Sequence, residues 1–426
     1  MLLGDKMNLR LGLLIPILFS CAVGAASAQT LPMSGRTPVP SNIIGEEYAA
    51  KGMPVGAFRL YPTLTGLVGT DDNVFRTDTE TVSDTFFVIS PRLSLETQSE
   101  GHFFALRGGV DVYEFADSSS ESRTDWFALA EGGTEVVQGT RIFGSVGYRD
   151  THEPRGYFDE ALSLAEPTPF SVFHADARIE SKPNRFGVAI GVGHDSTNYQ
   201  NSKLIGLGTA SNDDRDFDQF ELFGRLSYEF SPGYALYTHA AYNTRNFDLA
   251  LDRNGVNRDS TGYRVNAGVQ MEVTRLIVGE AYVGYLQQDY DAPLSNESGF
   301  NFGANILWSP SQTVDVRLGA AHNIVETVVS QDFVPATASN QQAFTLGIDY
   351  AIRPNVILNG DVGYLHNVFT GTSRTDDTTT FGAGATYLIN SYLSASAGYE
   401  HSNRDSTTVG QNYSDNIFWF SLGFQV

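Results

Sequence analysis

The chain has 426 residues, with 42 Gly, 20 Tyr and 28 Phe, and it carries a net charge of −22 at pH 7. Beyond residue 28 no stretch approaches the run of about twenty apolar residues that a transmembrane helix needs, which excludes a helical membrane protein. The composition is compatible with a membrane protein built from strands, because only alternate residues of such strands would face lipid. The strong acidity disfavours nucleic acid as a partner, since phosphate binding requires clusters of Lys and Arg.

Residues 1–28 have the pattern of a signal peptide. Lys6 and Arg10 precede the apolar run LGLLIPILFSCAVGAA, and the small residues ASA end at Ala28, where we expect cleavage. Cys21 is the single cysteine and leaves with this segment, so the mature chain forms no disulfide. A membrane anchor helix and a lipoprotein acylated at Cys21 are the weaker alternatives.

Residues 29–56 contain four prolines and no apolar period, which predicts a flexible periplasmic lead-in. From residue 57 to residue 426 the pattern changes to strict alternation, as in TVDVRLGA, where apolar residues occupy every second position. A two-residue period predicts strands with one apolar face. Eighteen such runs are expected, at 58–69, 84–97, 102–114, 124–137, 141–150, 170–181, 185–196, 217–230, 234–247, 261–273, 276–288, 299–308, 313–324, 342–352, 356–368, 378–388, 392–401 and 414–426.

The connectors between these runs alternate between short and long along the whole chain. Short ones such as QGT, KPN, SPG and RPN are separated by long polar ones such as DTHEPRGYFDEALSLAEPTP. Outer-membrane barrels have this asymmetry, with short periplasmic turns and long extracellular loops. The sequence therefore predicts an all-β fold: a single antiparallel up-and-down transmembrane β-barrel of about eighteen strands, with sixteen to twenty compatible with the pattern. A soluble β-sandwich is the alternative.

Aromatic residues gather at both ends of the apolar face of these strands. Rings with a polar tip prefer the two boundaries of a bilayer, so two aromatic belts are typical of a membrane-spanning barrel. The belts are expected at Tyr148, Tyr242, Tyr285, Tyr364 and Tyr399 before long loops, and at Phe230, Trp308, Tyr350 and Tyr387 before short turns.

The opposite face of the strands carries charges and rings, and it predicts a water-filled lumen. A lone Arg or Lys facing lipid at mid-depth costs about 2–4 kcal/mol, so the charges mark the inner face. Cross-strand pairing that merely stiffens the wall is the alternative role. The runs 124–137 and 276–288 are ambiguous, because apolar residues occupy both of their faces. The predicted channel-lining charges are Arg92, Glu96, Arg107, Asp111, Arg141, Asp176, Arg178, Glu221, Arg225, Arg245, Arg264, Asp315, Arg317 and Asp349, and the predicted lumen aromatics are Tyr61, Tyr113, Phe143, Phe223, Tyr237 and Trp419.

No residue pattern in the mature chain indicates an enzyme. It lacks a metal-binding HExxH, a phosphate-binding loop and a Gly-x-Ser-x-Gly motif, and its histidines form no ligand cluster. Four histidines lie on the lipid-facing parity near the long loops, where we interpret them as interfacial side chains. The acidic loop segment TDDNVFRTDTETVSD contains the oxygen ligands that a divalent cation prefers, but it lacks calcium-loop spacing, so a solvated rim is favoured. We expect a passive channel with no cofactor, no metal site and a modest preference for cations.

The last run, NIFWFSLGFQV, places Phe418, Phe420, Leu422 and Phe424 on the lipid side. It resembles the C-terminal signal that outer-membrane assembly machinery recognises, although it ends in Val instead of Phe. Outer-membrane lipid, lipopolysaccharide and this machinery are therefore the expected partners.

The first forty residues of the barrel carry a family resemblance. Pro62, the run DDNVF at 71–75 and the run SPR at 90–92 are similar to the opening of a family of outer-membrane beta-barrel porins associated with exopolysaccharide clusters. The resemblance implies a barrel in the bacterial outer membrane, and it implies export of an extracellular polysaccharide with the help of periplasmic export proteins. A general diffusion porin for small solutes, a structural barrel and a hydrolase acting at the rim remain the alternatives.

Overall fold

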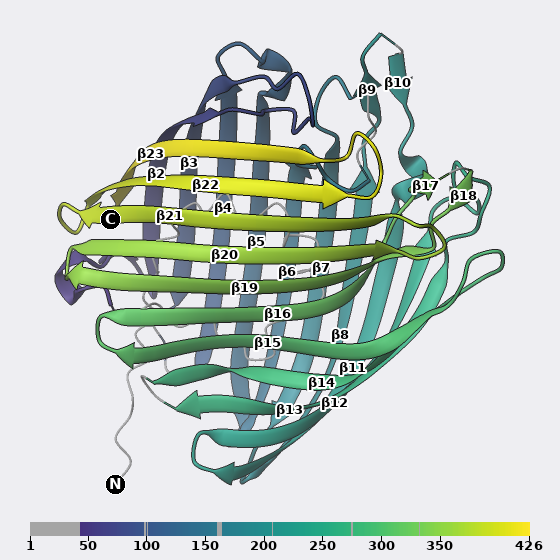
Figure 1. Ribbon diagram of the computed structural model, residues 1–426. Helices are drawn as coiled ribbons and strands as arrows, with labels where there is room; N and C mark the ends of the chain where they lie inside the picture. Colours follow the sequence, from purple (N-terminus) through teal and green to yellow (C-terminus); the bar gives the residue numbers. More distant parts are fainter. Residues whose placement is uncertain are drawn as a thin grey trace, which may run out of the picture.

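The computed structural model describes residues 43–97, 99, 101–159, 164–206, 208–273, 276–331 and 333–426 (Figure 1). The predicted signal peptide and residues 29–42 of the lead-in lie outside the described residues. Among the described residues no helix is long and apolar enough to span a membrane. The three short 3-10 helices described are η1 (Glu46–Tyr48), η2 (Ser119–Glu121) and η3 (Asp213–Arg215).

One sheet of 19 strands forms the body of the molecule. Its first member, β1 (Met53–Val55), pairs only with the first residues of the next strand, and the other eighteen form the wall. They are β2 (Phe58–Asp71), β3 (Asp84–Thr97), β4 (His102–Phe115), β5 (Arg123–Val137), β6 (Thr140–His152), β7 (Pro169–Ser181), β8 (Phe186–Tyr199), β11 (Phe217–Ser231), β12 (Tyr234–Phe247), β13 (Ser260–Val273), β14 (Ile277–Tyr290), β15 (Glu297–Ser311), β16 (Val314–Glu326), β19 (Ala338–Arg353), β20 (Val356–Phe369), β21 (Thr375–Leu388), β22 (Leu393–Ser406) and β23 (Tyr413–Gln425).

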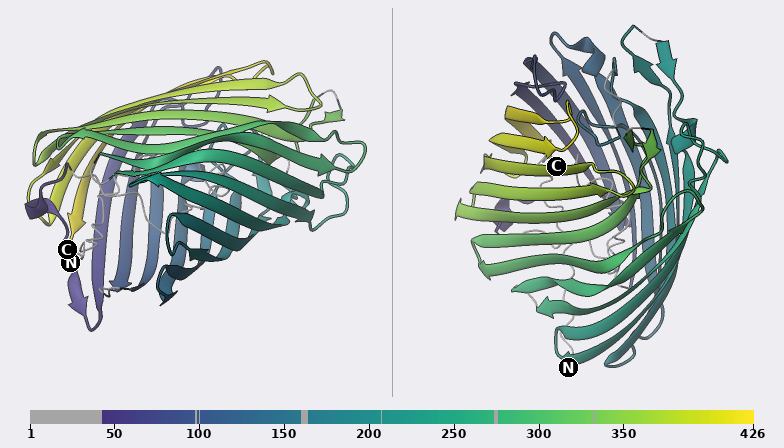
Figure 2. Two further views of the ribbon diagram at one scale, coloured as in Figure 1. Left: turned by 90° about the horizontal axis from the view of Figure 1, so that it is seen from below. Right: turned by 45° about the vertical axis from the view of Figure 1, so that its right-hand side comes forward.

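Each wall strand pairs antiparallel with its neighbours in sequence, and the first strand pairs with the last. Thr63 of β2 lies opposite Gln425 of β23, and the ladder runs to Asp71 opposite Ile417. Figure 2 shows the tilted strands following one another around the wall. The prediction of a single antiparallel barrel of about eighteen strands is confirmed.

Short turns and long loops lie at opposite ends of the barrel. The last residue, Val426, accepts a hydrogen bond from Gly52 N–H at 3.0 Å, so both described ends of the chain meet at the short-turn end. The long loops carry two small hairpins that the alternation pattern missed, because strands of two or three residues show no period. These are β9 (Ser202–Leu204) with β10 (Gly208–Ala210), and β17 (Ser330–Gln331) with β18 (Val334–Pro335).

The wall has an apolar outer face and a polar inner face, as β8 illustrates. Phe186, Val188 and Ile190 are exposed on the outside, while Gly191 on the inside is buried. A Cβ on Gly191 would lie 2.4 Å from the ring of Phe223 on the next strand. Glycine on the inner face therefore makes room for a neighbouring ring, and Phe223 is buried over it.

The described part of the lead-in packs against the short-turn end of the barrel. Ile43 is buried against Ala351, Ile357 and Leu388, on β19, β20 and β21. Gln425 donates a hydrogen bond to the carbonyl oxygen of Tyr48 at 3.0 Å. These contacts attach residues 43–48 to strands from the last third of the chain.

Candidate functional site: the lumen and its mouth

The predicted channel-lining charges on the first strands form ion pairs along the wall. Arg92 on β3 lies 3.0 Å from Asp111 on β4. Arg107 on β4 pairs with Glu96 on β3 at 3.3 Å and with Glu131 on β5. Each guanidinium thus reaches a carboxylate on a neighbouring strand, two residues away from the directly opposite position, so these charges are paired within the wall.

A second group of pairs lies on β11 to β14 and reaches across more than one strand. Arg225 of β11 stacks on the ring of Tyr237 at 3.5 Å and reaches Glu280 of β14 at 2.9 Å. Arg264 of β13 contacts Glu221 of β11 at 2.8 Å. Phe223, Asn266, Glu221, Tyr237 and Glu280 line an open recess here, whose volume is about 840 Å³ with its open mouth included.

The remaining predicted lumen residues have the following positions. Phe143 lies under the guanidinium of Arg178 at 4.6 Å, and Arg178 also contacts Glu180 at 2.8 Å. Tyr113 and Trp419 both pack against the buried cluster that contains Phe86, and the ring of Tyr113 lies under the guanidinium of Arg123 at 4.2 Å. Tyr61 is half-buried, and Arg141 is exposed on the inner parity.

The other predicted charges have polar partners. Asp176 contacts Ser145 and His174, and Arg245 contacts Gln219 and Glu326. Asp315 is buried and accepts a hydrogen bond from Ser309, and Arg317 pairs with Asp349.

The two ambiguous strands have their polar parity directed inward. Phe127 on β5 lies under the guanidinium of Arg92 at 5.7 Å, on the inner face. On β14, Glu280 and Tyr282 line the inner recess, and Val278 shares their parity. Leu276, which shares the parity of Val278, is exposed just before β14.

The predicted belt residues lie on the outer face. Tyr148, Tyr242, Tyr285 and Tyr364 are exposed towards the loop end, whereas Tyr399 is half-buried and donates a hydrogen bond to Asn416 at 2.7 Å. Phe230, Trp308, Tyr350 and Tyr387 are exposed at the turn end. On β23 the side chains of Phe418, Phe420, Leu422 and Phe424 are also exposed on the outside.

One long loop enters the mouth of the barrel. Its first residues, 153–159, follow β6, and we call them the mouth segment. Tyr157 N–H donates to the carbonyl oxygen of Pro154 at 3.1 Å, and Gly156 has a φ of +73°. Glycine suits this left-handed turn, and a Cβ there would lie 3.0 Å from both Arg76 and Tyr413. The turn therefore lets the segment approach other parts of the rim closely.

Arginines from distant parts of the chain hold the backbone of the mouth segment. Arg76 donates to the carbonyl oxygen of Arg155 at 3.1 Å, Arg374 to that of Phe158 at 3.1 Å, and Arg404 to that of Gly156 at 2.5 Å. Hydrogen bonds from charged donors are stronger than neutral ones. The segment is therefore fixed to the loop after β2, to the start of β21 and to β22.

Side chains of the mouth segment anchor it to the loops on either side of it, the β4–β5 loop and the β8–β11 loop. Glu153 binds Arg215 at the end of η3, with Oε2 3.0 Å from Nη1, and Arg155 binds Glu121 of η2 at 2.6 Å. Burial lowers the pKa of Arg215, but the Glu153 carboxylate beside it raises that pKa by more, well above its ordinary value. Burial raises the pKa of Glu153 above its ordinary 4.5, and the Arg215 guanidinium opposes that rise.

An apolar contact completes the anchoring. Phe158 packs on Phe369 and Ala336, with the two rings 5.7 Å apart. The segment and the facing strands line an open recess of about 900 Å³, its mouth included, with Phe158, Gln341 and Asn367 among the lining residues. The mouth segment thus lies across the upper end of the lumen and narrows the route through it.

Sequence reasoning missed these mouth residues. Arg155, Arg215 and Glu121 occur in polar loops without any period, where solvent exposure is the ordinary expectation. The one local signal was the Pro-Arg-Gly turn within a loop long enough to reach the lumen. The partners of that turn could not be read from the sequence.

Comparison with known proteins gives one family match. The sequence profile of the family described as "Putative beta-barrel porin 2" matches residues 46–426. No curated protein sequence matches the chain.

Solved structures share the barrel with low sequence identity. OccAB4 of Acinetobacter baumannii is 11% identical, and the match covers 88% of this chain and 99% of that chain with a TM-score of 0.43. A BenF-like porin of Pseudomonas fluorescens Pf-5 is 10% identical, covering 87% and 100% with a TM-score of 0.44. The copper transporter OprC is 9% identical, covering 88% and 82% with a TM-score of 0.48. No inference about cargo follows from likenesses at this level.

Proposed function

The chain belongs to the "Putative beta-barrel porin 2" family, and from this membership we propose that it is a passive outer-membrane channel that exports an extracellular polysaccharide. The family supports a channel in the outer membrane; the carbohydrate cargo and its direction are our proposal. Periplasmic export proteins would deliver the polysaccharide to the short-turn end of the barrel.

The observation that carries the proposal is the pairing of charges on the inner wall. Arg225 with Glu280, and Arg264 with Glu221, place donors and acceptors side by side at the lumen surface. Such a surface suits a cargo rich in hydroxyl groups, because hydroxyls both donate and accept hydrogen bonds. Each hydrogen bond contributes only about 0.5–1.5 kcal/mol net, so a sugar chain could exchange contacts and move on.

Rings and amides near these pairs support the same cargo. Tyr282, Asn266 and Asn301 line the recess next to the Arg225 pair. Amide groups donate and accept like hydroxyls, and aromatic faces pack against the apolar faces of sugar rings. A channel for a free ion would instead profit from unpaired charges of one sign.

A general diffusion porin for small solutes is the second candidate, and the mouth segment favours it. Arg76, Arg374 and Arg404 hold this segment across the upper lumen. A fixed constriction passes small molecules and excludes bulky ones. Export of a polysaccharide requires that a single extended chain pass beside the segment.

Conductance and a gene deletion together test the proposal. The purified mature chain in planar bilayers should conduct ions, and a series of linear oligosaccharides added on the short-turn side should block the current more strongly as chain length increases. Deletion of the chromosomal copy should reduce surface polysaccharide. Unchanged polysaccharide with slower uptake of small solutes would reject export and leave the diffusion porin.

The same preparation distinguishes a channel from a structural barrel and from a hydrolase at the rim. Absence of conductance under all salt and voltage conditions would favour the structural barrel. Release of fatty acid from added lipid would favour the hydrolase. Either result would overturn the proposed channel.

A further inference from the structure

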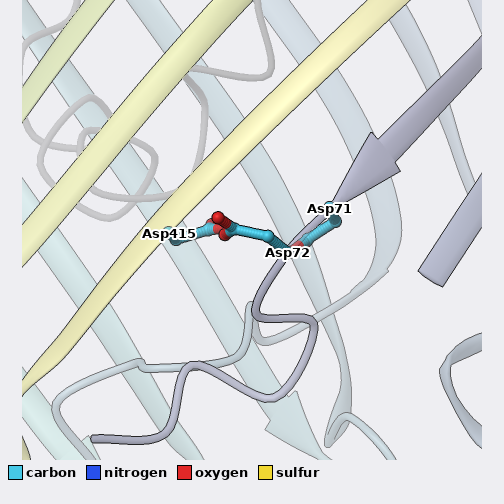
Figure 3. Close-up of side chains that lie close together, drawn as sticks. All are labelled: Asp71, Asp72 and Asp415. Carbon is cyan, nitrogen blue, oxygen red and sulfur yellow. The ribbon is translucent and has the colours of Figure 1, made fainter. Parts of the chain in front are cut away.

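Three carboxylates meet where the first and last strands of the barrel separate at the outer rim. The β2–β23 ladder ends at Asp71 opposite Ile417, and Asp72 N–H makes one more backbone hydrogen bond across the seam, to Asn416 O at 3.2 Å. One carboxylate oxygen each of Asp71, Asp72 and Asp415 lies within 4.8 Å of the other two. Figure 3 shows Asp71 and Asp72 at the end of β2 and Asp415 on the neighbouring strand.

Hydrogen bonds from N–H groups hold two of these carboxylates in place. Asn73 N–H donates to Asp71 Oδ1 at 2.7 Å. The backbone N–H and the side-chain amide of Asn416 donate to the two oxygens of Asp72, both at 2.7 Å. Each carboxylate oxygen has two lone pairs, so these bonds leave acceptor capacity for a further partner.

Asp415 supplies the observation that points to a ligand. Its side chain is 1% exposed, its Oδ1 accepts no hydrogen bond from an N–H or hydroxyl donor among the residues that the structure describes, and its carboxyl group lies beside that of Asp71. Its Oδ2 lies 3.4 Å from Arg76 Nε, so this guanidinium offsets one of the three negative charges. A buried carboxylate oxygen without a partner is unfavourable, and a bound cation would remove that penalty.

The spacing and chemistry of the cluster fit a hard divalent cation. Calcium binds oxygen ligands at 2.3–2.6 Å, so two ligands of one ion are at most about 5 Å apart. The cluster offers carboxylate oxygens, whereas zinc prefers nitrogen and sulfur ligands. Magnesium demands near-ideal octahedral geometry and gives up its waters reluctantly, while calcium accepts an irregular set of ligands from separate segments.

We propose that Asp71, Asp72 and Asp415 bind one Ca²⁺ ion that joins the first and last strands of the barrel. The ion would also fix the start of the loop after β2. That loop carries Arg76, which holds the mouth segment through the carbonyl oxygen of Arg155. Calcium at the seam therefore supports both closure of the wall and the position of the constriction.

Calcium binding to the mature chain tests this proposal directly. The chain is refolded from denaturant into detergent, free of lipopolysaccharide, and dialysed against chelator before calorimetric titration with CaCl2. We expect one ion per chain with a Kd of about 0.1–1 mM, the range of extracellular calcium modules, and a rise in the midpoint of thermal unfolding. MgCl2 should bind at least about tenfold more weakly because of its stricter geometry.

Two matched variants locate the site. Asp72→Asn keeps the side-chain shape but removes a ligand charge, and it should raise the Kd at least about tenfold. Asp78→Asn removes the same charge from an exposed position of the same loop, and it should bind like the wild type. If Asp72→Asn does not fold, Asp71→Asn takes its place.

Three results would overturn the proposal. The first is a wild-type chain that shows neither heat nor a thermal shift up to about 10 mM CaCl2, well above the expected Kd. The second is an equal loss of affinity in Asp72→Asn and Asp78→Asn, which indicates diffuse attraction by the acidic rim. The third is stabilisation by acid with none by CaCl2, which means that Asp71 and Asp415 share a proton instead of a cation.

Discussion

Removing the ring of Phe158 should release the mouth segment and widen the channel. Phe158 is 6% exposed and packs on Phe369 and Ala336, which are both 0% exposed. These two residues belong to β20 and to the loop before β19, so the ring attaches the mouth segment to the far wall. Phe158→Ala deletes this contact while leaving the backbone hydrogen bonds of the segment in place.

The size of the effect follows from burial. Replacing a buried Phe by Ala costs about 3–5 kcal/mol. We take the lower value, about 3 kcal/mol, because a loop can close part of the cavity that the ring leaves. Since about 1.4 kcal/mol corresponds to a tenfold change in an equilibrium, the ratio of released to docked segments should rise by about a hundredfold.

Single-channel recording in planar bilayers measures this release. Phe158→Ala should show a larger and noisier conductance than the wild type, and it should admit larger neutral polymers. Phe333→Ala is the matched control, because Phe333 is fully exposed in a long loop. The reasoning fails if Phe158→Ala and Phe333→Ala have the same conductance and the same polymer cut-off.

Three further predictions concern selectivity, topology and pH. Arg225→Ala removes the guanidinium that lies 2.9 Å from the Glu280 carboxylate. The reversal potential in a low-salt KCl gradient should therefore shift towards that of potassium, and the shift should fade at high salt. A shift towards the chloride potential would contradict this. A membrane-impermeant thiol reagent should label Ser211→Cys, in a long loop, but not Ser231→Cys, beside a short turn, on intact cells; equal labelling would reject the topology. Burial raises the pKa of Asp216 from 3.8 to about 6. Its charge therefore destabilises the loop above about pH 6, and this cost disappears as the pH falls towards about 4. Amide hydrogen exchange in that loop should be slower in Asp216→Asn than in the wild type at about pH 7.5 and equal near pH 4, whereas equal rates at both pH values would refute the shift.

The strands of this protein could be predicted from local sequence with good boundaries. The run expected at 234–247 coincides with β12, and the run expected at 84–97 coincides with β3. A barrel that satisfies its backbone hydrogen bonds between strands needs an apolar outer face at every second residue, so each strand carries the signal within itself. Short turns opposite long loops then determine an up-and-down order without knowledge of any distant contact.

Only the tertiary structure determines which residues form the hydrogen bonds and ion pairs at the mouth. Arg374 and Phe158 are 216 residues apart, yet Arg374 holds the carbonyl oxygen of Phe158. Asp71 and Asp415 come together only because closure of the barrel places the first strand beside the last. The alternation of apolar and polar residues indicates which face of a strand each residue occupies. It contains no information on the curvature that brings loops from opposite sides of the rim into contact. Loops have no such period, and the partners of their charged groups depend on that curvature.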